Sequence, residues 1–152
     1  MSARTPSTVA SSSCLRTLWL GAGWIGVVVV TYFTLAPNPP QIDLEQGDKL
    51  QHLFAYASLM LWFSQVQTGR AERRITALLL VALGIALEFA QGLTGYRFMS
   101  AADMAANTAG VALGWLAAPP RLPNAFAWGS TLLGRARCCQ ALHGDCTRDL
   151  KG

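Results

Sequence analysis

Ionisable side chains stand inside sequence that is otherwise suited to lipid. Glu88 lies in an apolar run, and Asp103 opens a second such run after a short loop that carries Arg97. Charged groups are costly within a membrane, so each of them is a candidate functional residue. With His52, these carboxylates have the chemistry to exchange protons or to hold a polar ligand. The full set of polar candidates is Asp48, Lys49, His52, Tyr56, Glu88, Gln91, Arg97, Ser100, Asp103 and Asn107.

The spacing of these residues places several of them on shared helix faces. Asp48, His52 and Tyr56 follow one another at intervals of four, and Glu88 and Gln91 are three apart. Residues three or four apart lie on the same face of an α-helix. His52 is then expected about 6 Å below Asp48 along one helix, and Glu88 roughly 8 Å below the end of another.

A third polar face belongs to the last apolar run. Asp103, Asn107, Gly110 and Gly114 follow at steps of four, three and four, just after Ser100. The two glycines are typical of positions where a neighbouring helix packs closely. If successive helices cross a membrane in opposite directions, the three polar faces meet at one depth below the same surface. We therefore expect one shared site.

Each candidate also has a purely structural explanation. His52 can be a hydrogen-bonded structural histidine, and Tyr56 can be a packing residue. Gln91 can form a hydrogen bond between helices. Asp48 can be a helix cap, with Lys49 as its solvated neighbour.

Glu88 is the hardest candidate to explain structurally. An ionised carboxylate in an apolar helix needs a cation or several hydrogen-bond donors. Arg97 either pairs with Glu88 or Asp103, or binds an anionic ligand. For Glu88, His52 and Lys49 are also within reach, but we expect Arg97 as its partner, because a guanidinium stays charged and can bind a carboxylate through two hydrogen bonds.

The composition is that of a membrane protein. The chain has 152 residues, of which 52% are hydrophobic and 13% are charged, whereas soluble domains carry about 25% charged residues. Its length corresponds to one domain.

Apolar runs predict an all-α fold, a four-helix transmembrane bundle. The first, residues 18–36, is free of charge and long enough to span a bilayer. A cleaved signal peptide is the alternative, although its apolar region would be shorter, about 7–15 residues. The first span is apolar all round and should lie peripherally, while the others should pack together through their polar faces. The other spans are predicted at residues 48–67, 75–93 and 99–118.

The segments outside the bundle read as tails. Residues 1–17 predict a disordered tail, and residues 119–152 a basic tail whose part 126–133 can lie on the membrane surface. This second tail contains Cys138, Cys139, His143 and Cys146. Their spacing matches no common zinc pattern, so we interpret the three cysteines as reduced thiols.

The basic residues indicate the orientation. Ten of the 12 Lys and Arg residues lie in the two tails or in residues 68–74. Short basic segments mark the cytoplasmic side, so both termini are predicted to be cytoplasmic and the polar site to face outward. Lys49 and Arg97 are the two basic residues on the outer side. The basic residues are thereby explained by topology, and we expect no nucleic-acid partner.

The polar motifs, taken in order, resemble the VanZ-like family of bacterial membrane proteins. The resemblance rests on DKLQHLFAY (48–56), EFAQ (88–91), and Arg97, Ser100, Asp103, Asn107 and Gly110 at their spacing. It covers about residues 18–118 and implies a multi-pass protein of the bacterial inner membrane. The founding member is linked to teicoplanin resistance, but most relatives have no assigned activity.

Three classes of function remain open. The outward cluster can bind or modify an envelope component: a lipid head group, a lipid-linked cell-wall precursor or a glycopeptide-type antibiotic. Alternatively, His52 with Glu88 or Asp103 performs acid–base chemistry in a membrane enzyme, or the chain is a small proton-linked transporter that needs to oligomerise. No cofactor is expected. A metal bound by His52, Glu88 and Asp103 is the least favoured possibility, because their spacing is not diagnostic.

Overall fold

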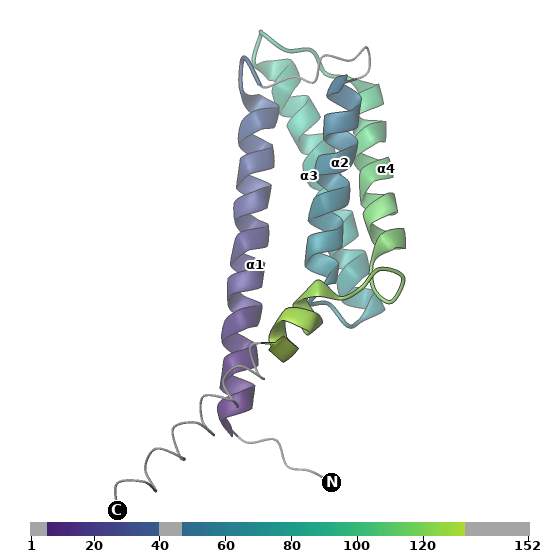
Figure 1. The fold of residues 1–152 in the computed structure, drawn as a ribbon. Helices are drawn as coiled ribbons and strands as arrows, with labels where there is room; N and C mark the ends of the chain where they lie inside the picture. Colours follow the sequence, from purple (N-terminus) through teal and green to yellow (C-terminus); the bar gives the residue numbers. More distant parts are fainter. Residues whose placement is uncertain (1–5, 40–46, 133–152) are drawn as a thin grey trace, which may run out of the picture.

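The described part of the chain consists of helices and the loops between them. The computed structural model describes residues 6–39 and 47–132, and within them it contains no strand. Figure 1 shows four long helices running along one axis. Residues 125–132 form a further, short helix. The long helices are α1 (Pro6–Leu35), α2 (Gly47–Ser64), α3 (Arg70–Leu93) and α4 (Ala101–Ala117).

Two of the helices are long and apolar enough to cross a membrane by length and composition. They are Cys14–Leu35 within α1 and Arg70–Leu93, the whole of α3. Helices α2 and α4 are shorter, with 18 and 17 residues. The predicted all-α fold is therefore confirmed, and two of its helices have the character of membrane spans.

The prediction of a disordered tail over residues 1–17 is wrong for residues 6–17, which belong to α1. An existing helix extends readily, because each added residue gains a hydrogen bond without a new nucleation step. Pro6 also suits the first helical position, where no amide hydrogen is needed. Residues 1–5 and 133–152, including the cysteine-containing motif, lie outside the described residues.

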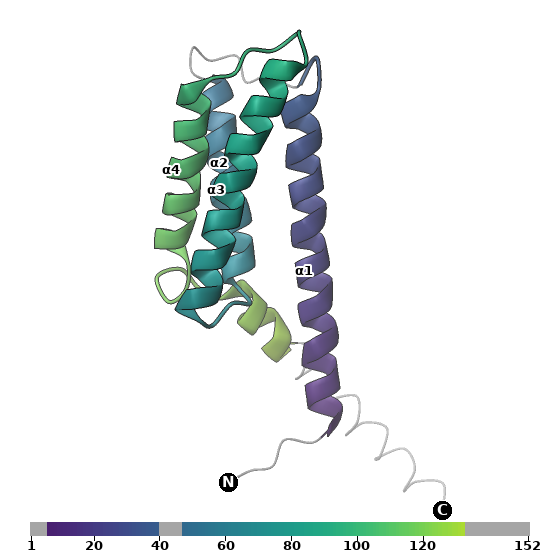
Figure 2. The ribbon, with the colours of Figure 1, turned by 180° about the vertical axis from the view of Figure 1, so that it is seen from behind.

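Helices α2, α3 and α4 pack into one group, and α1 stands beside it, as Figures 1 and 2 show from opposite sides. Helix α4 approaches α2 most closely at two glycines. A β-carbon on Gly110 would collide with the carbonyl oxygen of Leu53, and one on Gly114 would lie 2.5 Å from the carbonyl oxygen of Ala57. Only glycine permits this approach of the two backbones.

Helix α1 is held against the other helices near its middle and at its C-terminal end. Near its middle, the rings of Trp19 and Trp62 stack with centroids 4.1 Å apart. Each indole nitrogen donates a hydrogen bond to the carbonyl oxygen of the other tryptophan, at 3.0 and 2.9 Å. At its C-terminal end, Gln91 donates to the carbonyl oxygen of Thr34 at 2.6 Å, and Tyr96 to that of Leu35 at 2.7 Å.

The lower end of the bundle carries basic residues and the last described helix. Arg73 joins the α2–α3 connection to the segment after α4 by donating to the carbonyl oxygens of Gln67 and Pro119. Asn124 donates to the carbonyl oxygen of Gln65 at 3.0 Å, which places residues 125–132 at this end. The start of α1 and the start of α3 lie here, opposite the loop that contains Arg97 (Figure 1).

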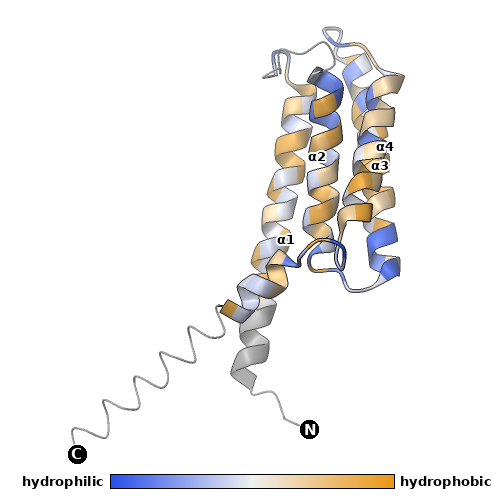
Figure 3. Ribbon diagram, turned by 45° about the vertical axis from the view of Figure 1, so that its right-hand side comes forward, coloured by the Kyte–Doolittle hydropathy of each residue, from blue (hydrophilic) through white to orange (hydrophobic). Residues whose placement is uncertain are grey.

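Besides a buried hydrophobic core that includes Leu59, Met60 and Val111, the bundle buries polar side chains and exposes large apolar ones. Glu88 and Asn107 are 0% and 2% exposed, whereas Leu78 and Trp24 are 70% and 62% exposed. Figure 3 shows hydrophobic colour along most of each helix, with hydrophilic segments at the start of α2 and the start of α3. Large apolar surfaces of this kind mark contact with lipid or with another protein.

Candidate functional site

His52 lies at the centre of the polar residues and joins two helices. It stands in the second turn of α2, is 8% exposed, and its Nδ1 is 3.0 Å from Oδ1 of Asn107 on α4. An amide oxygen only accepts, so Nδ1 carries the hydrogen and donates it. The neutral ring then keeps its lone pair on Nε2, which lies 3.8 Å from Oδ1 of Asp48.

Glu88 reaches the same place from α3. Its side chain is fully buried, and Oε2 accepts a hydrogen bond of 3.3 Å from the backbone N–H of Ser100. Its Oε1 lies 4.0 Å from Nδ1 of His52 and has no hydrogen-bond partner among the described residues. Only one of the two carboxyl oxygens of Glu88 thus has a hydrogen-bond donor among the described residues.

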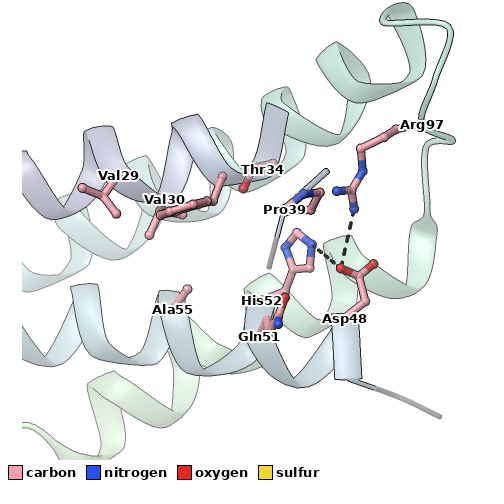
Figure 4. A pocket seen from close by; sticks show the side chains of 10 residues that line it. Val29, Val30, Thr34, Pro39, Asp48, Gln51, His52, Ala55 and Arg97 are labelled. Carbon is pink, nitrogen blue, oxygen red and sulfur yellow. Dashed lines mark ion pairs between the residues drawn. The ribbon is translucent and has the colours of Figure 1, made fainter. Parts of the chain in front are cut away.

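The ion pair of Arg97 differs from the expected one. Its Nη2 lies 3.5 Å from Oδ1 of Asp48, as drawn in Figure 4, and not beside Glu88. Arg97 extends from the α3–α4 loop across to the start of α2, while Glu88 points inward one turn below. Asp48 was not among the expected partners, because most of α2 and all of α3 separate the two residues along the chain.

Ser100 and Asp103 open α4 together. The hydroxyl of Ser100 caps the helix by accepting from the backbone N–H of Asp103 at 3.2 Å. The carboxyl group of Asp103 remains 6% exposed, and its Oδ1 has no partner among the described residues. Asp48, His52 and Asp103 each offer a ligand atom, and these atoms lie within 4.8 Å of one another.

Among the described residues, three of the predicted site residues form no hydrogen bond or ion pair with this group. Gln91 bonds to α1, as described above, and Tyr56 is 1% exposed one turn deeper on α2, where its hydroxyl lacks a hydrogen-bond partner. Lys49 forms no ion pair with a carboxylate among the described residues, although it lies next to Asp48. The structure therefore brings seven of the ten residues together; they are Asp48, His52, Glu88, Arg97, Ser100, Asp103 and Asn107, here called the polar cluster.

A pocket of about 310 Å³ adjoins the polar cluster between α1 and α2. Figure 4 shows His52, Asp48 and Arg97 at one end of it and the α1 side chains Val29 and Val30 at the other. Its wall is completed by Phe33, Thr34, Pro39, Gln51 and Ala55. The pocket is thus apolar along the helices and charged at the end formed by Asp48, His52 and Arg97, which is here called its mouth.

Sequence reasoning missed two contributions to the site. It placed α1 at the periphery and gave it no role, yet α1 supplies one wall of the pocket. It also passed over Gly84, where a β-carbon would lie 3.0 Å from the side chain of Asn107. The signal for Gly84 was its position four residues before Glu88 on the same helix face.

The hydrogen bond between His52 and Asn107 should contribute to stability. We expect Asn107→Leu to lower the free energy of unfolding by about 1–2 kcal/mol, because the N–H of a buried imidazole loses its acceptor. The matched control is Thr108→Val, since the exposed Thr108 hydroxyl bonds only within α4, to the carbonyl oxygen of Met104. Unfolding titrations in detergent measure both; equal losses for the two variants would contradict this role.

Comparison with known proteins adds no relative: no protein-family model, curated protein or solved structure matches the chain. The resemblance to VanZ-like proteins therefore rests on the motifs alone.

Proposed function

We propose that all four long helices cross a membrane and that the polar cluster faces outward. The support is the exposed apolar surface of α1 and α3 around buried polar groups. Helix α4, with 17 residues, extends about 26 Å, close to the roughly 30 Å of a hydrocarbon core. Arg70, Arg73, Arg74 and Arg121 lie at the end away from the cluster, as expected for the cytoplasmic side.

The function we propose is the binding of a membrane amphiphile in the pocket between α1 and α2. The observation that carries the proposal is the polarity of this pocket, which has apolar walls and a charged mouth. Val29 and Phe33 are 44% and 43% exposed on α1, so the pocket opens toward the lipid-facing surface. An alkyl chain can enter from that side while its head group stays at the mouth.

The charges at the mouth select the head group. Arg97 offers hydrogen-bond donors and a permanent positive charge that suit a phosphate. Asp48, 38% exposed beside it, accepts hydrogen bonds from hydroxyl or ammonium groups. A head group with a phosphate and donors matches both side chains. Envelope phospholipids and lipid-linked cell-wall precursors have this chemistry, and the VanZ-like resemblance points to the same class of envelope component.

The orientation can be tested by cysteine labelling of intact cells. Phe98 is 93% exposed in the α3–α4 loop, so Phe98→Cys, in a chain whose native cysteines are serines, should react with a membrane-impermeant maleimide. The native Cys14, kept as the single cysteine, should react only after permeabilisation. Labelling of Cys14 in intact cells would overturn the topology.

Ligand binding can be tested by native mass spectrometry of protein extracted from its own membrane. The wild type should retain a phosphate-containing lipid. Arg97→Gln should lose the lipid because the head-group phosphate no longer has a guanidinium to bind. Ala55→Phe should lose it because the aromatic ring fills the pocket. Arg70→Gln is the matched control, since Arg70 is exposed at the opposite end of the bundle.

The outcomes separate binding from folding. Both pocket variants should elute as the wild type does in size exclusion, because Arg97 lies in the α3–α4 loop and Ala55 is only partly buried and faces the pocket. Lipid retained equally by all four proteins would show that it binds elsewhere on the apolar surface and would exclude the pocket.

A further inference from the structure

Three side chains from two helices offer metal-binding atoms to one point. Asp48 and His52 come from the first two turns of α2 and Asp103 from the first turn of α4, with their ligand atoms within 4.8 Å of one another. An imidazole with two carboxylates is a donor set used for divalent transition metals. The sequence had suggested Glu88 in place of Asp48, because the approach of Asp48 to Asp103 depends on how α2 meets α4.

The orientation of His52 favours coordination. Metal-binding histidines commonly donate their second ring N–H to an oxygen, which fixes the tautomer and the plane of the ring. Asn107 performs this role here, as its Oδ1 lies 3.0 Å from Nδ1. The lone pair on Nε2 is thereby directed toward Asp48, at 3.8 Å. This distance is too long for a hydrogen bond and leaves room for an ion between the two atoms.

The buried oxygens supply a second, independent indication. Asp103 Oδ1 and Glu88 Oε1 are buried and lack hydrogen-bond partners among the described residues. Native proteins rarely leave such atoms unpaired, and a bound ion is one of the reasons that they do. Asp48 and Asp103 bring two carboxyl groups to this point, and only Asp48 has a guanidinium beside it, that of Arg97, so a divalent cation would balance the remaining charge.

We propose that Asp48, His52 Nε2 and Asp103 bind one divalent transition-metal cation of the Mn²⁺ or Zn²⁺ type. With metal–ligand bonds of about 2.1 Å, neighbouring ligand atoms lie roughly 3.0–3.4 Å apart, so the carboxylates close by about 1 Å or more. Asp48 is free to make this movement because it is 38% exposed. Glu88 faces the Nδ1 side of the ring and does not coordinate the ion.

Arg97 does not block the proposed metal site, and an ion can reach it. A carboxylate has two oxygens with about four lone-pair positions, so Asp48 can hold the cation and Arg97 together. The pocket lined by Asp48, His52 and Arg97 provides a path to the ligand atoms. The inference does not depend on a lipid in that pocket, since the three ligands come from α2 and α4 alone.

The test is a Mn²⁺ titration of the full-length protein in detergent after treatment with a chelator. Free Mn²⁺ is followed by its electron paramagnetic resonance signal. Mn²⁺ is chosen because the thiols of Cys138, Cys139 and Cys146 prefer softer ions such as Zn²⁺. We expect one Mn²⁺ per chain in the wild type, and at least tenfold weaker binding in Asp48→Asn and in Asp103→Asn.

A matched control and a decisive variant complete the design. Glu72→Gln removes an exposed carboxylate at the far end of α3 and should bind as the wild type does. Asp48→Asn decides the matter if the buried Asp103→Asn variant fails to fold, since Asp48 lies at the exposed start of its helix. A wild type without stoichiometric binding, or Asp48→Asn binding as tightly as Glu72→Gln, would overturn the proposal.

Discussion

The polar cluster depends on one constraint: polar side chains buried among apolar helices must find partners within the bundle. The hydrogen bond from His52 to Asn107 meets this demand between α2 and α4. It requires the two helices to lie close together, which Gly110 and Gly114 permit at successive turns of α4. Gly84 leaves room for the Asn107 side chain from the third helix. Glycine packing and polar pairing are thus two parts of one arrangement, since loss of the close approach would separate the histidine from its acceptor.

Helix α1 is held to the other helices at separate points along its length, and the pocket lies between these points. Tryptophan stacking holds it near its middle, and hydrogen bonds from Gln91 and Tyr96 hold its C-terminal end. Along the upper half, small and branched side chains such as Ala55 and Val30 leave a space open between α1 and α2. The charged residues at the mouth of this space belong to the same cluster that joins α2 to α4. A ligand bound there would therefore contact Asp48, His52 and Arg97 of the polar cluster.

The sequence predicted the helices well because their signals are local. Apolar runs, prolines 37, 39 and 40, and the Ser100 cap can each be interpreted within one segment. The convergence of His52, Asp103 and Asn107 was also predictable, since helical spacing and alternating direction place them at one depth. The partner of Arg97 could not be predicted, because its contact with Asp48 depends on the course of the α3–α4 loop and on the lateral position of α2. The role of α1 was missed for a similar reason: a uniformly apolar helix carries no sequence signal that distinguishes a pocket wall from a lipid-facing surface.

If the polar cluster and the adjoining pocket form a ligand site rather than a structural core, a bound amphiphile should be visible there. A cryo-electron microscopy map of the protein in nanodiscs of its native lipid, with a bound antibody fragment to add mass, would reveal it. We expect density for an alkyl chain against Val29, Val30 and Ala55, continuing to a head group at Arg97. Closure of α1 onto α2, with no space between Val30 and Ala55 and no density at Arg97, would contradict it.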